Sequence, residues 1–79
     1  MPLFGSSKKI FKSKQEIKDA LYRVKTLDYR ERPNVYEALV KELGDGGVTS
    51  HELRRVIGEL KAKGEISEID KKNLLGLIN

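Results

Sequence analysis

Residues 46–60 read GGVTSHELRRVIGEL, and residues 64–78 read GEISEIDKKNLLGLI. The two stretches follow one plan at a distance of 18 residues: a glycine, an aliphatic residue, a hydroxyl residue, an acid three positions later, and an apolar stripe. In a capping box, a hydroxyl and an acid at this spacing satisfy the free N–H groups at the start of a helix. The boxes pair Thr49 with Glu52, and Ser67 with Asp70. The repeat therefore predicts two capped helices.

These two helices are expected at about 50–63 and 68–78, each entered through a tight turn. The first turn is rich in glycine and carries Val48 before its threonine cap, and the second carries Ile66 between a glycine and its serine cap. A single aliphatic residue in this position suits a side chain that enters the core and fixes the turn. The repeat thus describes two capped turns at the two ends of one shared helix.

A third capping box, formed by Ser13 and Glu16, predicts a first helix at about 14–27. The apolar residues of this segment recur at steps of three or four, which places them on one helical face. They are Ile17, Ala20, Leu21, Val24 and Leu27. This face must be covered by another part of the chain.

A second helix is expected at about 33–43. Pro33 suits the first turn of a helix and disfavours helical geometry at the residue before it, so it separates this helix from the first. No stretch alternates between apolar and polar residues, and we expect no sheet beyond an isolated bridge. The sequence therefore predicts one small all-α domain of four helices over residues 13–79, arranged as a bundle or as an open zigzag.

The composition is that of one small domain with an ionic surface. Charged residues make up 35% of the 79 residues, against about 25% in an average domain, and such enrichment is common in thermophile proteins. The chain has no cysteine, which excludes disulfides, thiolate nucleophiles and cysteine-based metal sites. No apolar run approaches the roughly 20 residues that cross a bilayer. We therefore expect a cytoplasmic protein without stable membrane insertion.

Positive charge is concentrated in the N-terminal part of the chain. Residues 1–32 hold nine Lys or Arg and four Asp or Glu, a net charge of +5, whereas residues 33–79 hold seven and eight, a net charge of −1. Residues 1–12 show no helical period and are expected to form a flexible basic arm before the domain. An anionic partner should therefore meet this end of the chain.

Aromatic residues fall in the same basic part, since all five lie within the first 36 positions. Cations beside stacking surfaces are what single-stranded nucleic acid requires. The candidate residues for a nucleic acid or another anionic surface are Lys8, Lys9, Lys12, Lys14, Arg23, Tyr29, Arg30 and Arg32. In the alternative interpretation, the lysines keep the arm soluble and Tyr22 and Tyr36 cover the small core. Weak contact of the arm with an anionic membrane surface is a third interpretation.

The sequence offers little equipment for catalysis. His51 is the sole histidine and is expected in the first turn of its helix, where the helix dipole disfavours the imidazolium form. The hydroxyls of Ser13, Thr49 and Ser67 are accounted for as helix caps. A lone histidine cannot complete a usual zinc site without several carboxylates. We therefore expect a protein that is not an enzyme and has no cofactor or metal.

Two parts of the chain resemble known helical families. Residues 45–53, DGGVTSHEL, resemble the second half of an EF-hand calcium loop, which implies a final ligand at Glu52. The ligand positions that should precede this half carry Lys41 and Leu43, neither of which suits a calcium cage. Residues 53–79 resemble a SHOCT-type helical hairpin. That resemblance implies a small appended interaction module and transfers no functional residues.

These observations favour a non-enzymatic helical module for binding or assembly, which buries an apolar surface of a protein partner. Leu77 and Ile78 are the candidate interface residues, and internal packing is the alternative for both. The partner is another protein or a second copy of the chain, because so small a domain gains stability from association. A nucleic-acid-binding protein that uses the basic arm and the first helix is the alternative function.

Overall fold

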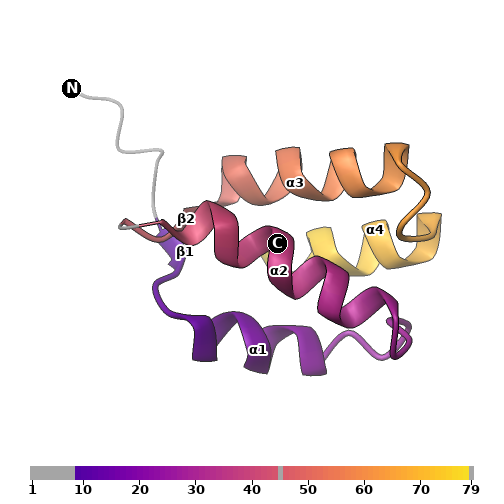
Figure 1. The fold of residues 1–79 in the computed structure, drawn as a ribbon, viewed down its shortest axis with the longest axis horizontal. Helices are drawn as coiled ribbons and strands as arrows, with labels where there is room; N and C mark the ends of the chain where they lie inside the picture. The colour runs from indigo at the N-terminus through magenta and orange to yellow at the C-terminus, as the bar shows by residue number, and fades with distance from the viewer. Residues whose placement is uncertain (1–8, 45, 79) are drawn as a thin grey trace.

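Four α-helices run back and forth along the long axis of the molecule (Figure 1). The structure is a computed structural model that describes residues 9–44 and 46–78. The helices are α1 (Lys14–Tyr22), α2 (Glu31–Leu43), α3 (Ser50–Ala62) and α4 (Glu68–Leu75), and a short 3₁₀ helix, Gly76–Ile78, follows α4. The prediction of a small all-α domain with four helices is confirmed.

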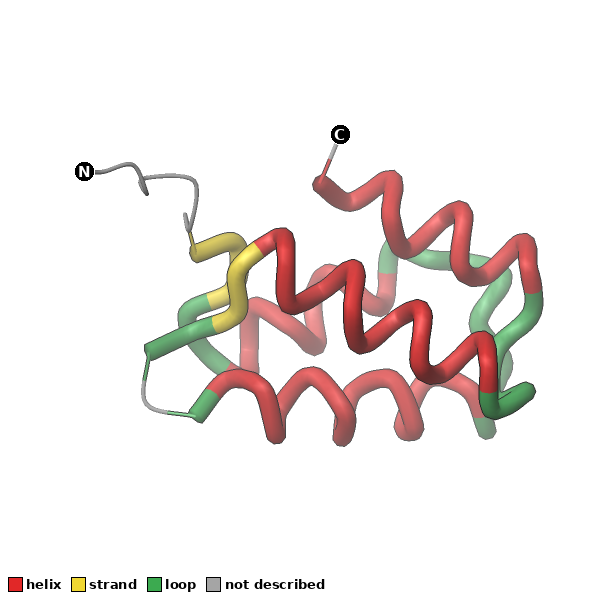
Figure 2. Tube along the Cα trace, turned by 90° about the horizontal axis from the view of Figure 1, so that it is seen from above, coloured by secondary structure: helices red, strands yellow, loops and turns green. Residues whose placement is uncertain are grey.

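Each helix packs against the next one in the chain, and successive helices run in opposite directions (Figure 1). Seen from above, α2 and α4 lie on either side of α3 (Figure 2). The side chain of Asn73 on α4 donates to the Thr26 hydroxyl in the α1–α2 connection at 3.1 Å, which ties the last helix back to the first connection. The helices therefore form a bundle rather than an open zigzag.

The interior of the bundle is filled by apolar side chains from all four helices and from the connections between them. These side chains are Phe11, Ile17, Ala20, Leu21, Val24, Leu27, Val35, Leu39, Val48, Leu53, Val56, Ile57, Leu60, Ile66 and Leu74. Full burial of one aliphatic side chain of this kind contributes about 1.5–3 kcal/mol to stability. The apolar stripes read from the sequence thus face one shared core.

The two repeated turns have the hydrogen bonds that the capping boxes predict. The Thr49 hydroxyl accepts from the Glu52 N–H at 3.1 Å, and the Glu52 carboxylate accepts from the Thr49 N–H at 2.9 Å. Ser67 and Asp70 make the same reciprocal pair at 3.1 Å in both directions. The α4 helix ends earlier than predicted, because its last residues, Gly76–Ile78, tighten into the 3₁₀ helix.

A small antiparallel sheet joins the N-terminal segment to the first of these turns. Strand β1 (Lys9–Phe11) pairs with strand β2 (Val48–Thr49), and Phe11 is buried in the core. Gly47 has a φ of 96°, and a Cβ there would lie 2.8 Å from the Phe11 carbonyl oxygen, so the turn requires glycine. The sequence predicted that Lys9–Phe11 belong to the flexible basic arm and that no sheet forms beyond an isolated bridge, so strand β1 is a correction. Residues 1–8 lie outside the described residues.

The first helix is shorter than the predicted range of 14–27, because α1 ends at Tyr22. Val24 and Leu27 nevertheless stay buried, since single tight turns hold the chain against the core: the Val24 N–H donates to the Leu21 carbonyl, and the Leu27 N–H to the Val24 carbonyl. At the start of α1, the Ser13 hydroxyl caps the helix as predicted. The Glu16 carboxylate, however, accepts from the Lys12 N–H at 2.7 Å and not from the Ser13 N–H, so the capping box is only half formed.

The second helix starts earlier than the predicted residue 33, at Glu31. The Asp28 carboxylate accepts from the Arg30 and Glu31 N–H groups at 2.8 and 2.7 Å, and the Glu31 carboxylate accepts from the Asp28 N–H at 3.0 Å. This exchange has the hydrogen-bond pattern of a capping box one turn ahead of Pro33, and it accounts for the earlier helix start. The proline then sits within the first turn of α2, as its chemistry predicts.

Candidate ligand-binding pocket

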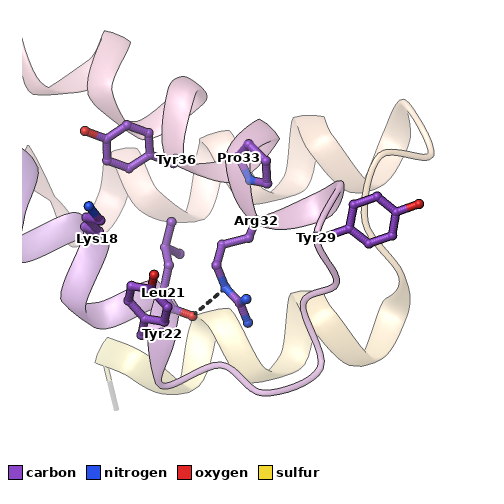
Figure 3. A pocket seen from close by; sticks show the side chains of 7 residues that line it. All are labelled: Lys18, Leu21, Tyr22, Tyr29, Arg32, Pro33 and Tyr36. Atoms are coloured by element: carbon purple, nitrogen blue, oxygen red, sulfur yellow. Dashed lines mark hydrogen bonds between the residues drawn. The ribbon is translucent and has the colours of Figure 1, made fainter.

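All three tyrosines of the chain line one pocket of about 320 Å³ between α1 and α2 (Figure 3). The pocket is lined by Lys18, Leu21, Tyr22, Tyr29, Arg32, Pro33 and Tyr36. Figure 3 shows Tyr22, Tyr36 and Lys18 toward one end of this set and Tyr29 at the other end, with Arg32 and Pro33 between them. The aromatic rings are therefore spread along the pocket rather than stacked on one another.

Helical spacing and the α1–α2 connection bring these side chains together. Lys18 and Tyr22 are four residues apart on α1 and share one face of that helix. Pro33 and Tyr36 are three residues apart on α2 and likewise share a face. Because α1 and α2 run antiparallel, the two faces meet, and Tyr29 is added from the connection between the helices.

Two of the tyrosines are unusually exposed. Tyr22 is 60% exposed and Tyr29 is 82% exposed, and within residues 9–44 and 46–78 the other large hydrophobic side chain of this kind is Ile69. Tyr36 is half-buried and packs against the core. The interpretation of Tyr22 as a cover of the core is therefore wrong, whereas Tyr36 does cover it. An exposed aromatic ring with a polar hydroxyl is suited to contact with a partner.

Arg32 lines the pocket and is held in place by several hydrogen bonds. Its guanidinium donates to the carbonyl oxygens of Leu21, Val24 and Leu27, at 3.4, 3.1 and 2.9 Å. It also lies over the ring of Tyr22, with Cζ 5.6 Å from the ring centroid. These contacts cap the carbonyl end of α1 and order the connection. Arg32 was predicted from the sequence as an anion contact, and its main contacts in the structure are internal.

The charged groups at the pocket are all positive. The charged side chains that line it, Lys18 and Arg32, are both cations. A third cation, Arg30, lies over the ring of Tyr29 with Cζ 5.9 Å from the centroid. No carboxylate, imidazole or thiol is among the lining side chains. This arrangement is suited to contact, stacking and attraction of negative charge.

The other cations predicted for an anionic partner do not gather at this pocket. Lys12 and Lys14 are exposed near the start of α1, and Lys9 is exposed on β1. Lys9 acts on Glu52 instead of the pocket. The hydrogen bond from the Thr49 N–H is the main cause that lowers the pKa of the Glu52 carboxyl below its usual value, and the Lys9 ammonium lowers it further. Lys8 lies outside the described residues. The predicted set therefore splits, and Tyr29, Arg30 and Arg32 are its members at the pocket.

The predicted interface residues Leu77 and Ile78 are half-buried and pack against the core. Leu77 also lines a second hollow of about 630 Å³, where it meets Arg23 and Lys72. Internal packing therefore accounts for much of their apolar surface. His51 is exposed in the first turn of α3, where the sequence placed it.

A pair of carboxylates, Glu31 on α2 and Asp70 on α4, lies close together outside the pocket lining. Asp70 is only 1% exposed, and its Oδ1 has no hydrogen-bond partner among the described residues. Burial acts to raise the pKa of Asp70, but the Thr26 hydroxyl, the Ser67 N–H and Glu31 outweigh it and lower the pKa. Burial raises the pKa of Glu31, and Asp70 raises it further. Two acids thus face each other across α2 and α4.

Replacement of Glu31 by glutamine should stabilise the protein by about 0.5–1 kcal/mol at pH 7, because the amide can donate to Asp70 Oδ1 and still accept from Asp28. A raised pKa means that Glu31 contributes stability when protonated and loses it as pH rises through its folded-state value, above 4.5. The difference in unfolding free energy between Glu31→Gln and wild type should therefore shrink as pH falls toward that value. Urea denaturation from pH 4 to 8 measures this difference, and the exposed Glu65→Gln is the control. Equal stability of Glu31→Gln and wild type at pH 7 would contradict the prediction.

Neither a metal site nor a membrane span is present in the described part of the chain. Residues 9–44 and 46–78 hold no group of three or more His, Asp or Glu side chains that could bind a metal ion. None of the helices in these residues has the length and apolar character to cross a membrane.

The sequence contained a signal for the pocket that residue type alone did not reveal. Tyr22, Tyr29 and Tyr36 recur at intervals of seven residues, from the last residue of α1 through the connection into α2. Residues on both sides of the turn in an antiparallel helical hairpin can meet on one surface. The regular spacing of the tyrosines, together with Lys18 four residues before Tyr22, is the signal for this shared surface.

Comparisons of the chain with protein-family models, with curated proteins and with solved structures found no match. The EF-hand and SHOCT resemblances therefore assign no family.

Proposed function

We propose that this protein is a small non-enzymatic binding module that holds a protein partner at the pocket between α1 and α2. The observation that carries the proposal is that all three tyrosines of the chain line this one pocket, two of them well exposed. Tyrosine and arginine are enriched among the residues that dominate the energy of protein interfaces. A concave, mostly apolar surface with a few polar groups is also the usual form of a binding site.

The walls of the pocket support this role because they are ordered before a partner arrives. Arg32 is held by three carbonyl oxygens, and Leu21 is buried in the core. Tyrosine loses little conformational freedom on binding, since it has only two side-chain torsions. A partner therefore meets a preformed surface and loses less affinity to the ordering of side chains.

Nucleic-acid binding is a second candidate, favoured by the cations that accompany the tyrosines. Arg30 and Arg32 lie over the rings of Tyr29 and Tyr22, and Lys18 lines the same pocket. Bases of a single strand stack on such rings while lysines and arginines contact the phosphates. The apolar character of the pocket interior favours a protein partner over this alternative.

Capture of partners from a lysate of the source organism tests the proposal. Immobilised wild-type protein should retain one or more proteins after nuclease treatment, and the double variant Tyr22→Ala/Tyr29→Ala should lose most of them. Both side chains are largely exposed, so the variant should fold normally; circular dichroism checks this. Ile69→Ala removes the large exposed hydrophobic side chain on α4 and is the matched control.

The possible results separate the two candidates. Retention of the same proteins by the double variant would show that the pocket is not the contact surface. Loss of all captured material after nuclease treatment would favour the nucleic-acid alternative.

A further inference from the structure

We propose that the pocket binds an extended, acidic segment of a partner protein that presents proline rings to the three tyrosines. This inference rests on the proposed function and names the chemistry of the segment. It follows from the backbone groups, the shape and the charge of the pocket.

The backbone around the pocket offers no edge for strand pairing. Two walls are the helices α1 and α2, whose internal hydrogen bonds occupy most backbone groups. At the end of α1 and in the connection, the carbonyls of Leu21, Val24 and Leu27 accept hydrogen bonds from Arg32. The described strands β1 and β2 lie at the other end of the bundle (Figure 1). The segment must therefore be recognised through side chains, which excludes addition of a strand to a sheet edge.

The shape of the pocket favours an extended segment over a helix. With about 320 Å³, the pocket lies at the small end of the range for ligand sites, about 300–1,000 Å³. An amphipathic helix needs a longer apolar groove for anchors three and four residues apart. A polyproline II segment has no internal hydrogen bonds and leaves its carbonyls free. Tyrosine rings that are spread along a groove can stack on its prolines, and their hydroxyls can donate to its carbonyls (Figure 3).

The charge of the pocket selects an acidic segment. Lys18 and Arg32 are the charged residues of the lining, and Arg30 stands beside Tyr29. Residues 9–33 carry eight Lys or Arg and four Asp or Glu, a net charge of +4, so the surrounding field has the same sign. Acidic residues beside the prolines would be attracted to this surface, and the attraction would weaken with added salt.

The test measures binding of fluorescein-labelled ten-residue peptides by fluorescence anisotropy, with the full chain at low salt. One peptide carries proline at every third position with glutamates between. A second replaces the prolines by alanine, a third replaces the glutamates by lysine, and a fourth probe is single-stranded oligothymidylate. The first peptide should bind saturably, and the second and third at least about tenfold more weakly, a difference of about 1.4 kcal/mol.

Variants locate the contact. Tyr29→Ala should weaken binding of the acidic proline peptide at least about tenfold, Lys18→Ala should weaken it and reduce its salt dependence, and Ile69→Ala should leave it unchanged. Arg32 is left intact, because its replacement would disturb the fold. Equal binding of the proline and alanine peptides, tighter binding of oligothymidylate, or no binding of any peptide would overturn the inference. If no peptide binds while lysate capture still depends on the tyrosines, the segment chemistry is wrong and the proposed function stands.

Discussion

Replacement of Arg32 by methionine should lower the free energy of unfolding by about 3 kcal/mol. The guanidinium donates to three carbonyl oxygens that lie past the last regular hydrogen bonds of α1, in a half-buried position. A hydrogen bond to a charged group contributes about 1.5–3 kcal/mol. The Leu21 and Val24 carbonyls would keep the N–H groups of Val24 and Leu27 as donors, whereas the Leu27 carbonyl would lose the donor at 2.9 Å. Water can also reach part of this site, so the three contributions are not summed in full. Methionine keeps the apolar length of the side chain and removes the donors.

Two further variants separate the hydrogen bonds from the positive charge. Arg32→Lys keeps the charge, but a single ammonium cannot reproduce the planar fork that contacts three carbonyls, so most of the loss should remain. Arg30→Met removes a neighbouring exposed guanidinium that lies over Tyr29, and the expected loss is below about 0.5 kcal/mol. Urea denaturation monitored by circular dichroism measures all three variants. Wild-type stability of Arg32→Lys would show that charge alone is required.

The parts of the fold that the sequence predicted correctly depend on neighbours within a few residues. Thr49 with Glu52 and Ser67 with Asp70 form their capping boxes across three positions, so the pattern of residue types is sufficient. The apolar stripes were also read correctly, because helical periodicity is a local property. Asp28 and Glu31 have the same spacing and exchange the same hydrogen bonds, whereas Pro33 predicted a later helix start.

The end of α1 could not be predicted in the same way, because its cause lies far along the chain. Arg32 donates to Leu21, eleven residues away, and thereby stabilises an early helix end that the stripe through Val24 and Leu27 does not reveal. Those two residues are buried whether or not they are helical. Residue burial was therefore predictable, and the backbone conformation was not.

The candidate site was predicted only in part, again because contacts between residues far apart in the chain decide which side chains meet. Tyr29, Arg30 and Arg32 were chosen for their residue types and do lie at or beside the pocket. Lys18, Tyr22 and Tyr36 were missed because their proximity depends on how α1 and α2 pack. Charge counting along the chain shows which half of the protein is basic, but only tertiary structure shows which cations face one ligand.

Replacement of Phe11 by alanine should lower the free energy of unfolding by about 3 kcal/mol, at the lower end of the range for a buried phenylalanine. The ring is 7% exposed and belongs to the core, although Lys9–Phe11 was expected to be part of a flexible arm. Its loss leaves a cavity where β1 meets the turn before α3, and a domain of this size has a total stability of only about 4–12 kcal/mol. Ile10→Ala, on the same strand but half-buried, should cost less. Thermal and urea denaturation measure both variants, and if Phe11→Ala unfolds at the same urea concentration as wild type, β1 is not part of the cooperative fold.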